Sequence, residues 1–299
     1  MGGPSTEREV SLKSGEAVVR GLEAAGYDVS EVVVDGESFD LPSGVEAVFI
    51  ALHGMFGEDG SVQELLDRQG MPYTGSGAES SRCSFDKITT KEMLVASRIP
   101  TADYAMVSHG TPCPLAFPVV VKPARQGSTI GISKVDSEAS WEDAVTGAFA
   151  YGDRVLAETF IPGRELTVGL LDGQVLPVVE VVAREGWYDY QAKYETQETA
   201  YVVPAEISGA LGEQCQALAL RSFEALGARG MARVDFRMRD RDNTLFVLEL
   251  NSIPGFTECS LLPKAAAAAG IDFAALCDRI MRTATCDSSV RIKDGAEIS

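Results

Sequence analysis

Apolar positions in the first 78 residues alternate between helical spacing and short continuous runs. Residues 7–25 carry apolar side chains three or four positions apart, which predicts an amphipathic helix. The runs 32–34 and 47–52 are apolar throughout and predict buried strands, and 61–69 predicts another short helix. Helices that alternate with strands are typical of a parallel α/β sheet, so we expect one here.

The middle of the chain has a different pattern. One helix rich in charged and hydroxyl side chains is predicted over 78–98, before Pro100. Four short strands are predicted after it, at 117–122, 154–161, 166–171 and 175–182, and one further helix at 141–150. The dipeptide Asp172-Gly173 separates the last two strands and predicts a tight hairpin.

The last third begins with a long polar stretch, 184–203, that contains five aromatic residues. Loops of this length inside a domain are usually functional. A helix is predicted at 210–227, a hairpin at 231–251, and two short helices after it. We place domain boundaries near residues 78 and 162.

Composition narrows the class of protein. A formal net charge of −18 disfavours a nucleic-acid partner, because phosphate binding needs a concentrated basic face. The six cysteines form no Cys-x-x-Cys pair and the chain has two histidines, which argues against a zinc site and favours a reducing compartment. The sequence shows neither a membrane-spanning apolar stretch nor a signal peptide. We therefore expect a cytoplasmic protein without a membrane partner.

Polar side chains recur at every second position of the two strands in the 231–251 hairpin. Alternate residues of a strand share a face, so Arg233 and Asp235 point the same way, as do Glu249 and Asn251. A regular hairpin centred on Asp242 places Asp235 opposite Glu249 and Arg233 opposite Asn251. One face then carries two carboxylates and an amide oxygen close together.

Two neighbouring carboxylates repel each other unless a cation neutralises them. Mg²⁺ prefers oxygen ligands and shares its shell with nucleotide phosphates, and the Arg233 guanidinium suits a phosphate. The hairpin therefore predicts a magnesium–phosphate centre. The alternative is the solvent-exposed polar face of an ordinary amphipathic hairpin, and the hairpin pattern alone does not decide between them.

A second candidate for phosphate binding lies earlier in the chain. An apolar strand ends at Lys122 and leads into 124–131, a segment of glycines and small residues. Such a segment exposes backbone N–H groups and can close around phosphate oxygens. It lacks the spacing of a Walker loop, and such a segment taken alone is more often an ordinary loop than a phosphate site. Its position between a lysine-tipped strand and the acidic hairpin favours a flap over a nucleotide.

Several short motifs, spread in order over about residues 2–280, together resemble those of the D-alanine–D-alanine ligases. The motifs are 2–11, 51–54, 57–60, 73–77, Asp86-Lys87, the Lys122 segment, 188–190, Lys193-Tyr194 and 251–255. The resemblance implies an ATP-grasp fold of the α/β and α+β classes. It assigns 1–78 to an N-terminal parallel α/β domain on the substrate side, 79–162 to a central ATP-grasp subdomain, and 163–299 to a C-terminal one with metal and substrate sites.

The resemblance implies that ATP drives the joining of two D-alanines into D-alanyl-D-alanine, through an acylphosphate, for peptidoglycan synthesis. It also implies a homodimer. Asp235, Glu249 and Asn251 would hold two Mg²⁺ (or Mn²⁺) ions, and Arg233 would stabilise the transferred phosphoryl group. Lys87 and Lys122 would contact phosphates, while Glu158 and Glu165 would bind adenine and ribose. The complete implied nucleotide set is Lys87, Lys122, Ser128, Glu158, Glu165 and Lys193.

The implied substrate side begins with Glu7, Ser128 and Tyr194, which would hydrogen-bond together and hold the 184–203 loop over the site. Glu7 would bind the ammonium group of the first D-alanine. The other implied substrate residues are His53, Gly255, Ser260 and Leu261. The implied catalytic residues are Glu7, Ser128, Tyr194, Arg233 and Ser260. A tyrosine at position 194 favours an amine over a hydroxy acid as acceptor.

These residues have structural alternatives. Glu7 lies in the first turn of a predicted helix, where an acid suits the helix dipole, and Thr6 with Glu9 forms a plausible capping box. The structural alternative for Ser128 is a turn residue, for Tyr194 a loop aromatic, and for His53 a structural histidine. The run of matching motifs favours the functional interpretation.

The sequence departs from the family at its start. The family has an apolar strand before the Gly-Gly motif, whereas this sequence begins at Met1-Gly2-Gly3. We therefore expect the N-terminal domain to lack its usual first strand, and we interpret the start as misassigned. Met55-Phe56 also replaces smaller residues before Gly57, which would alter the entrance to the site.

Other functions remain open. One alternative is an ATP-grasp ligase whose second substrate is D-lactate or a different amino acid. A non-catalytic nucleotide-binding protein would not need all three metal ligands. A dinucleotide-dependent oxidoreductase is excluded, because Gly75-Ser76-Gly77 is not followed by a third glycine at Rossmann spacing.

Overall fold

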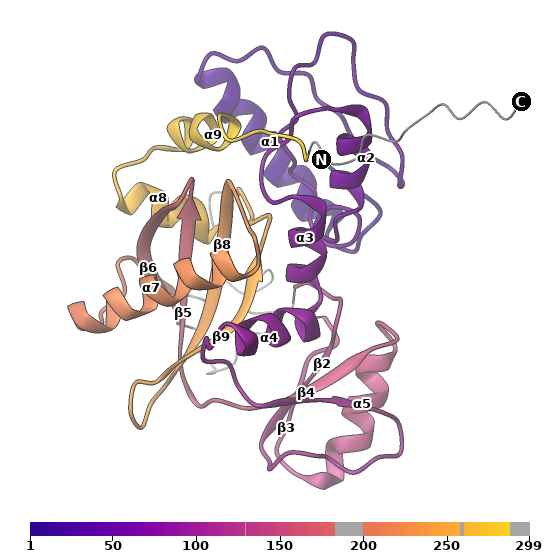
Figure 1. Cartoon of the computed structure of the whole chain (residues 1–299), viewed down its shortest axis with the longest axis vertical. Coiled ribbons are helices and arrows are strands. Elements are labelled where there is room, and N and C mark those ends of the chain that lie inside the picture. The colour runs from indigo at the N-terminus through magenta and orange to yellow at the C-terminus, as the bar shows by residue number, and fades with distance from the viewer. Residues whose placement is uncertain (129, 183–199, 258–259, 288–299) are drawn as a thin grey trace, which may run out of the picture.

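Two antiparallel sheets and an N-terminal layer of helices follow one another along the long axis of the molecule (Figure 1). The computed structural model describes four stretches of the chain, residues 1–128, 130–182, 200–257 and 260–287. The predictions for 188–190, Lys193 and Tyr194 fall outside them. Within these stretches, no helix has the length and apolar content needed to cross a membrane.

The larger sheet has five strands in the order β7-β6-β5-β8-β9, each antiparallel to its neighbours. The strands are β5 (Gly163–Leu171), β6 (Gln174–Val182), β7 (Ala200–Val202), β8 (Met231–Arg239) and β9 (Leu245–Asn251). Helix α7 (Gly209–Ala225) packs on this sheet, and Leu166, Val168 and Phe236 are fully buried in the core between them.

The hairpin predicted at Asp172-Gly173 is confirmed, because Leu171 pairs with Gln174 across it. Asp172 and Gly173 have φ angles of 49° and 74°. A two-residue type I′ turn requires positive φ at both central positions, and an Asp-Gly pair adopts it at low cost.

The smaller sheet has four strands in the order β1-β4-β2-β3 and is also antiparallel. It consists of β1 (Tyr104–Val107), β2 (Val119–Pro123), β3 (Ser133–Val135) and β4 (Val155–Thr159), with η1 (Glu138–Ser140) and α5 (Trp141–Phe149) beside it. Lys122 pairs with Leu156, two residues from Glu158. Lys122 and Glu158 therefore share one face of this sheet.

Gly147, on the exposed side of α5, is a site where a side chain should stabilise the protein. A Cβ built there meets no atom within 4 Å, and glycine in a helix costs roughly 0.5–1 kcal/mol relative to alanine. We expect Gly147→Ala to raise the free energy of unfolding by about that amount, as measured by urea denaturation. Gly169→Ala is the opposite control, because its Cβ would lie 2.7 Å from Leu262 Cδ1. A loss of stability in the Gly147 variant would contradict the expectation.

The single helix predicted over 78–98 is wrong, because the structure has two helices, α3 (Ala78–Phe85) and α4 (Lys87–Ala96). Asp86 separates them in an extended conformation, with φ −88° and ψ 106°. Its carboxylate accepts hydrogen bonds from the N–H groups of Ile88 (3.0 Å) and Thr89 (3.2 Å). An aspartate that caps a helix in this way starts a new one, which places Lys87 in the first turn of α4.

The N-terminal layer contains the predicted helices α1 (Arg8–Ala24) and α2 (Ser61–Gln69), but 32–34 and 47–52 do not form the predicted strands. Two isolated bridges, Gly2 with Val34 and Val48 with Tyr73, pair the chain in the expected parallel direction. Side-chain hydroxyls take the place of further ladder bonds: Ser11 Oγ donates to Ala51 O (2.5 Å) and accepts from the N–H of Gly2 (3.0 Å). Hydroxyls that bond the backbone compete with sheet formation.

Helices α8 (Leu261–Ala268) and α9 (Phe273–Met281) join this N-terminal layer to the larger sheet. Helix α9 packs closely on α1, since a Cβ at Gly21 would lie 2.7 Å from Cys277 Sγ. One apolar core accordingly contains Leu22 from α1, Cys277 from α9 and Val179 from β6. The boundaries near residues 78 and 162 stay predictions.

Candidate active site

The hairpin of β8 and β9 has the register that strand parity predicts. Arg233 pairs with Asn251, and Asp235 pairs with Glu249. The register then shifts, and Phe236 pairs with Val247. A bulge at this point increases the local twist of the strand, and such bulges are common beside active sites.

Asp235 lies at the centre of the polar face of this hairpin, and its side chain is 13% exposed. It accepts hydrogen bonds from Arg233 Nε (2.9 Å) and Nη2 (2.8 Å), and from Asn251 Nδ2 (2.9 Å). Thr167 Oγ1, on β5, donates to it at 2.5 Å. Thr167 was missed in the sequence, where a lone hydroxyl within the apolar run 166–171 is the available signal. These four hydrogen bonds satisfy a charge that would otherwise be costly to bury.

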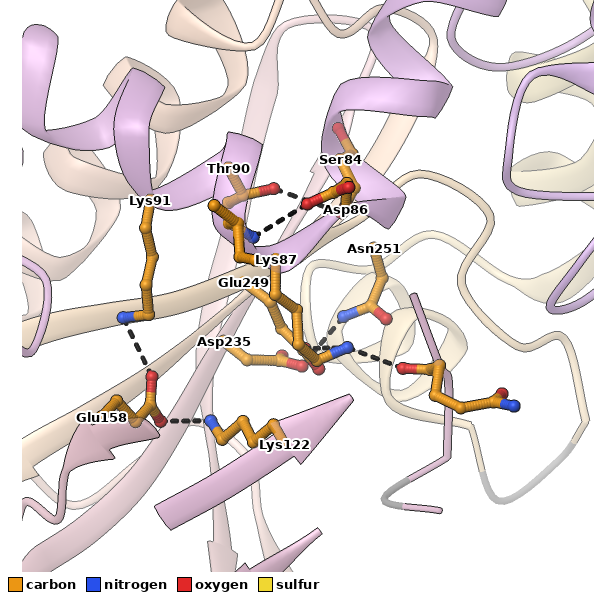
Figure 2. A network of polar contacts seen from close by, with 12 residues as sticks. Ser84, Asp86, Lys87, Thr90, Lys91, Lys122, Glu158, Asp235, Glu249 and Asn251 are labelled. Carbon is orange, nitrogen blue, oxygen red and sulfur yellow. Dashed lines mark hydrogen bonds and ion pairs between the residues drawn. The ribbon is translucent and has the colours of Figure 1, made fainter. Parts of the chain in front are cut away.

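Lys87 links the acidic hairpin to the small-residue loop. Its Nζ lies 3.5 Å from Glu249 Oε2 and donates to Gln126 O at 2.6 Å. Figure 2 shows Lys87 extending from the start of α4 toward Glu249, with Asp235 and Asn251 close by. The backbone N–H of Lys87 also donates to Ala124 O at 2.9 Å, so the loop is attached to α4 at two points.

Glu158, which is 3% exposed, is held between two lysines. Lys122, on β2, contacts Glu158 Oε1 with its Nζ. Lys91, on α4, places its Nζ 2.9 Å from Glu158 Oε2 (Figure 2). Burial alone would raise the pKa of Glu158, but the charges and hydrogen bonds of Lys122 and Lys91 lower it to about 2. Lys91 was missed in the sequence, where its position one helical turn after Lys87 is the available signal.

Glu7 does not cap its helix. It is the residue before α1, but its side chain makes no capping hydrogen bond. The N–H of Glu7 itself donates to Ser5 Oγ at 3.2 Å. On the side chain, Ser128 Oγ donates a hydrogen bond to Glu7 Oε1, as the resemblance implied.

The Glu7 carboxylate packs against two glycines. A Cβ at Gly127 would lie 2.4 Å from Glu7 Oε2, and a Cβ at Gly54 would lie 2.8 Å from the same atom. Glycine at these positions permits the close approach of two backbone segments to one carboxylate. Helix α1, the turn at Gly54 and the loop at 127–128 therefore meet at Glu7. The predicted third member of this group, Tyr194, lies outside the described residues.

A second carboxylic acid, Glu58, lies beside this group. Its Oε2 accepts a hydrogen bond from the N–H of Gly54 at 2.6 Å. Burial and the neighbouring charge of Glu7 raise the pKa of Glu58 to about 8, although Gly54 and Arg233 oppose the shift. The shift therefore favours the protonated form of Glu58 at neutral pH.

This proton makes stability depend on pH. The pKa of Glu58 is raised from an ordinary value of 4.5, so its contribution to stability is complete below pH 4.5 and is lost as the pH rises to about 8. We expect the free energy of unfolding to fall less between pH 5 and 8 in Glu58→Gln than in the wild type, because glutamine mimics the protonated acid. Urea denaturation at several pH values measures this. The exposed Glu213→Gln on α7 should keep the wild-type slope, and an unchanged slope in Glu58→Gln would contradict the prediction.

His53 is buried and hydrogen-bonds to Ser14 Oγ through Nε2 at 2.9 Å. Burial lowers the pKa of His53 to about 4, with Arg233 adding to the effect, and a hydrogen bond to the backbone of Ile253 opposes it. The ring is therefore neutral near pH 7. Ser14 Oγ also accepts from the N–H of Phe256 at 3.2 Å, so His53 is connected to the segment after β9.

The remaining predicted residues lie in three surroundings. A Cβ at Gly255 would lie 2.7 Å from Ser260 Oγ, so these two are adjacent, and Ser260 Oγ accepts from the N–H of Thr257 at 3.0 Å. Leu261, which begins α8, is 8% exposed and packs in the core beneath the N-terminal layer. Glu165, on β5, pairs with Arg237 at 3.5 Å.

The acidic face suits a hard divalent cation. Among the described residues, no group of three or more histidine, cysteine, aspartate or glutamate side chains is placed to hold a metal ion. Asp235 and Glu249 nevertheless supply two carboxylates, and Asn251 adds an amide oxygen. Mg²⁺ beside nucleotide phosphates takes one or two carboxylates from the protein and completes its shell with phosphates and water. The donor set therefore fits such an ion.

The fold matches solved structures of D-alanine–D-alanine ligase from Bacillus anthracis. One of them, a complex with ATP, has a TM-score of 0.82 at 29% identity and covers 95% of this chain and 94% of its own. Another has a TM-score of 0.83 at 33% identity and covers 95% of each chain. Together with the two sheets and the acidic hairpin, these matches define the class as an ATP-grasp ligase, as predicted.

Sequence comparison gives the family. Models of the D-ala D-ala ligase C-terminus and N-terminus match residues 94–282 and 36–76. A D-alanine–D-alanine ligase from Syntrophotalea carbinolica is 47% identical and covers 95% of this chain and 94% of that protein. One from Methylacidiphilum infernorum is 44% identical and covers 94% and 92%. The chain therefore belongs to the D-alanine–D-alanine ligases, a family of ATP-dependent ligases.

Proposed function

We propose that this chain joins two D-alanines into D-alanyl-D-alanine for peptidoglycan synthesis, with cleavage of ATP to ADP and phosphate. The observation that carries the proposal is the register that sets Asp235 opposite Glu249, with Arg233 on the first carboxylate and Lys87 beside the second. Alternating carboxylates and cations suit a polyphosphate with its divalent cations, because both signs of charge need partners.

The nucleotide would lie between the two sheets. Lys87, Lys122, Ser128 and Lys193 would contact its phosphates. Glu158 and Glu165 would bind adenine and ribose. The contact of Lys87 with both Glu249 and Gln126 supports this, since it connects the acidic hairpin to the phosphate loop. Asp235, Glu249 and Asn251 would hold two Mg²⁺ (or Mn²⁺) ions, which would neutralise phosphate charge when bound.

The first D-alanine would bind with its ammonium group on Glu7 and with His53 nearby. Ser128 fixes the Glu7 carboxylate against Gly127 and Gly54, which supports a role in orientation. Because His53 is neutral, it adds no repulsion toward the ammonium group. The second D-alanine would bind near Gly255, Ser260 and Leu261. Tyr194 would complete the group around Glu7 and favour an amine as acceptor.

The reaction would have two displacements. A carboxylate oxygen of the first D-alanine attacks the γ-phosphorus, the bond to ADP breaks, and an acylphosphate forms. The amine nitrogen of the second D-alanine then attacks the acyl carbon, loses a proton, and phosphate leaves. Arg233 would stabilise the negative charge on the phosphoryl group and on the tetrahedral oxyanion, and fixed positions of both substrates would supply further acceleration.

The test is an assay of the purified protein with ATP, Mg²⁺ and D-alanine. We expect equal amounts of phosphate and D-alanyl-D-alanine. A parallel reaction with added D-lactate, analysed by mass spectrometry, detects an ester product and would indicate the alternative acceptor. Binding of ATP without phosphate release would instead support a non-catalytic nucleotide-binding protein.

We further propose that the protein is a cytoplasmic homodimer. The family resemblance implies a dimer, and it also implies substrates that are made inside the cell. Light scattering after size-exclusion chromatography measures the mass in solution. A mass equal to one chain of 31.9 kDa would contradict the dimer.

A further inference from the structure

Lys91 is a buried lysine that the proposed reaction does not use. Its side chain is 2% exposed, and its Nζ lies 2.9 Å from Glu158 Oε2. The same Nζ donates to Thr101 Oγ1 at 2.8 Å and to Ala102 O at 3.4 Å. The ring of Tyr104 lies 5.4 Å from it. An ammonium group is seldom buried this deeply unless its charge has a partner.

The Glu158 carboxylate has one cationic partner more than neutralisation requires. Lys91 and Lys122 both contact its carboxylate, so two positive charges surround one negative charge. With Lys122 alone, the charge of that lysine would be used to neutralise a buried carboxylate. Burial lowers the pKa of Lys91, and the neighbouring charge of Glu158 opposes the shift. A protonated Lys91 gives the group a net positive charge, and Lys122, at 12% side-chain exposure, is the lysine nearer the surface.

The anchoring of Lys91 explains how it can serve as the permanent partner. Thr101 Oγ1, which accepts from Lys91, itself donates to Val247 O at 2.8 Å. Val247 lies on β9, two residues before Glu249. Lys91 is thus fixed by α4 at one end and by Glu158 and Thr101 at the other, and Thr101 connects it to β9 of the larger sheet. Lys122 projects from the end of β2 (Figure 2).

We propose that Lys91 is a positioning residue for nucleotide binding, which neutralises and fixes the Glu158 carboxylate from inside the fold so that Lys122 keeps its charge for the nucleotide. The proposal rests on the proposed function, in which Lys122 contacts phosphate and Glu158 binds the adenine side. Lys91 acts through these two residues and does not touch the nucleotide itself.

The experiment measures the Kd of the full chain for ATP with Mg²⁺ by calorimetry. Lys91→Gln keeps a hydrogen-bonding side chain but removes the charge, and we expect it to weaken ATP binding by about tenfold or more. The KM for D-alanine at saturating ATP should stay near the wild-type value, which a general loss of structure would not allow. Lys91→Arg should recover most of the affinity, because it restores the charge.

A double-mutant cycle tests whether Lys91 acts through Lys122. If it does, Lys122→Met should reduce ATP affinity much less in the Lys91→Gln background than in the wild type. Thr101→Val is the structural control: it removes a hydrogen bond of Lys91 and leaves the charge, so it should lower the melting temperature more than the ATP affinity. Lys91→Met is a second neutral variant should the glutamine variant not fold.

Two results would overturn the proposal. One is wild-type ATP affinity in a folded neutral variant, and the other is strict additivity of the Lys91 and Lys122 substitutions. Failure of the proposed function would be distinct, because the wild-type protein would then make no D-alanyl-D-alanine in the same buffer.

Discussion

Asp235→Asn is expected to lower kcat/KM for dipeptide formation by about 10²–10³-fold, the range seen when one preorganised electrostatic contact to a developing charge is removed. The carboxylate of Asp235 accepts two hydrogen bonds from Arg233 and one each from Thr167 and Asn251. An asparagine cannot accept all four, because one of its two polar atoms is a donor. It also removes one of the two negative charges proposed to hold Mg²⁺.

The hairpin provides a matched control for this substitution. Asp242 lies at the exposed turn between β8 and β9 and pairs with Arg239 at 2.8 Å. Asp242→Asn therefore removes the same charge from the same hairpin at an exposed ion pair, and such pairs contribute little to stability. We expect its kcat/KM to match that of the wild type. If both variants retained full activity at every Mg²⁺ concentration, the acidic face would not be the metal centre.

Gly127→Ala is expected to lower kcat/KM for D-alanine by about 10²-fold, the loss that follows when a catalytic group is misplaced by about 1 Å. The new Cβ would lie 2.4 Å from Glu7 Oε2 and 3.1 Å from its Cδ. The Glu7 side chain can move away, so the protein should fold, but the movement separates Glu7 from Ser128. The KM for D-alanine should rise more than the Kd for ATP, because the three atoms nearest the new methyl group belong to Glu7 and not to Lys87 or Lys122.

Gly147→Ala is the control for this second prediction. It adds the same methyl group at an open position on α5, so it should be stabilising and fully active. Steady-state kinetics with D-alanine as the varied substrate, together with ATP calorimetry, measure both effects. An alanine at position 127 that left the KM for D-alanine unchanged would show that the position of Glu7 does not matter for binding.

The sequence predicted the β5–β6 and β8–β9 hairpins of the larger sheet well, because their signals are local. It did not predict β7, which lies within the stretch 184–203 that was expected to be a loop. The pairings of Asp235 with Glu249 and of Arg233 with Asn251 follow from a short turn and from the two-residue period of a strand. The Asp172-Gly173 turn is equally local. Continuous apolar runs were less informative. In 47–52, hydroxyl groups of Ser11 and Thr74 bond the backbone of Ala51 and Ile50, and in 32–34 the pairing among the described residues is limited to one bridge between Val34 and Gly2.

The helix over 78–98 shows a different limit. Its apolar and charged positions fit one helix, and the break at Asp86 depends on a cap, as well as on two arginines from other segments. Arg125 Nε and Arg154 Nη1 donate to Asp86 Oδ2 at 2.8 and 2.6 Å. Those partners lie 39 and 68 residues away along the chain. Pattern alone could not place them.

By itself, the sequence determined which residue types face one another within hairpins and the family to which the chain belongs, because strand parity, turn composition and ordered motifs are readable along the chain. The contact of Glu7 with Ser128, which the family resemblance implied and residue patterns did not, is present in the tertiary structure. Only that structure showed that Lys91 shares Glu158 with Lys122. The first of these contacts joins residues 121 positions apart. Such contacts form when separate elements pack together, and no periodic pattern in the sequence records that packing.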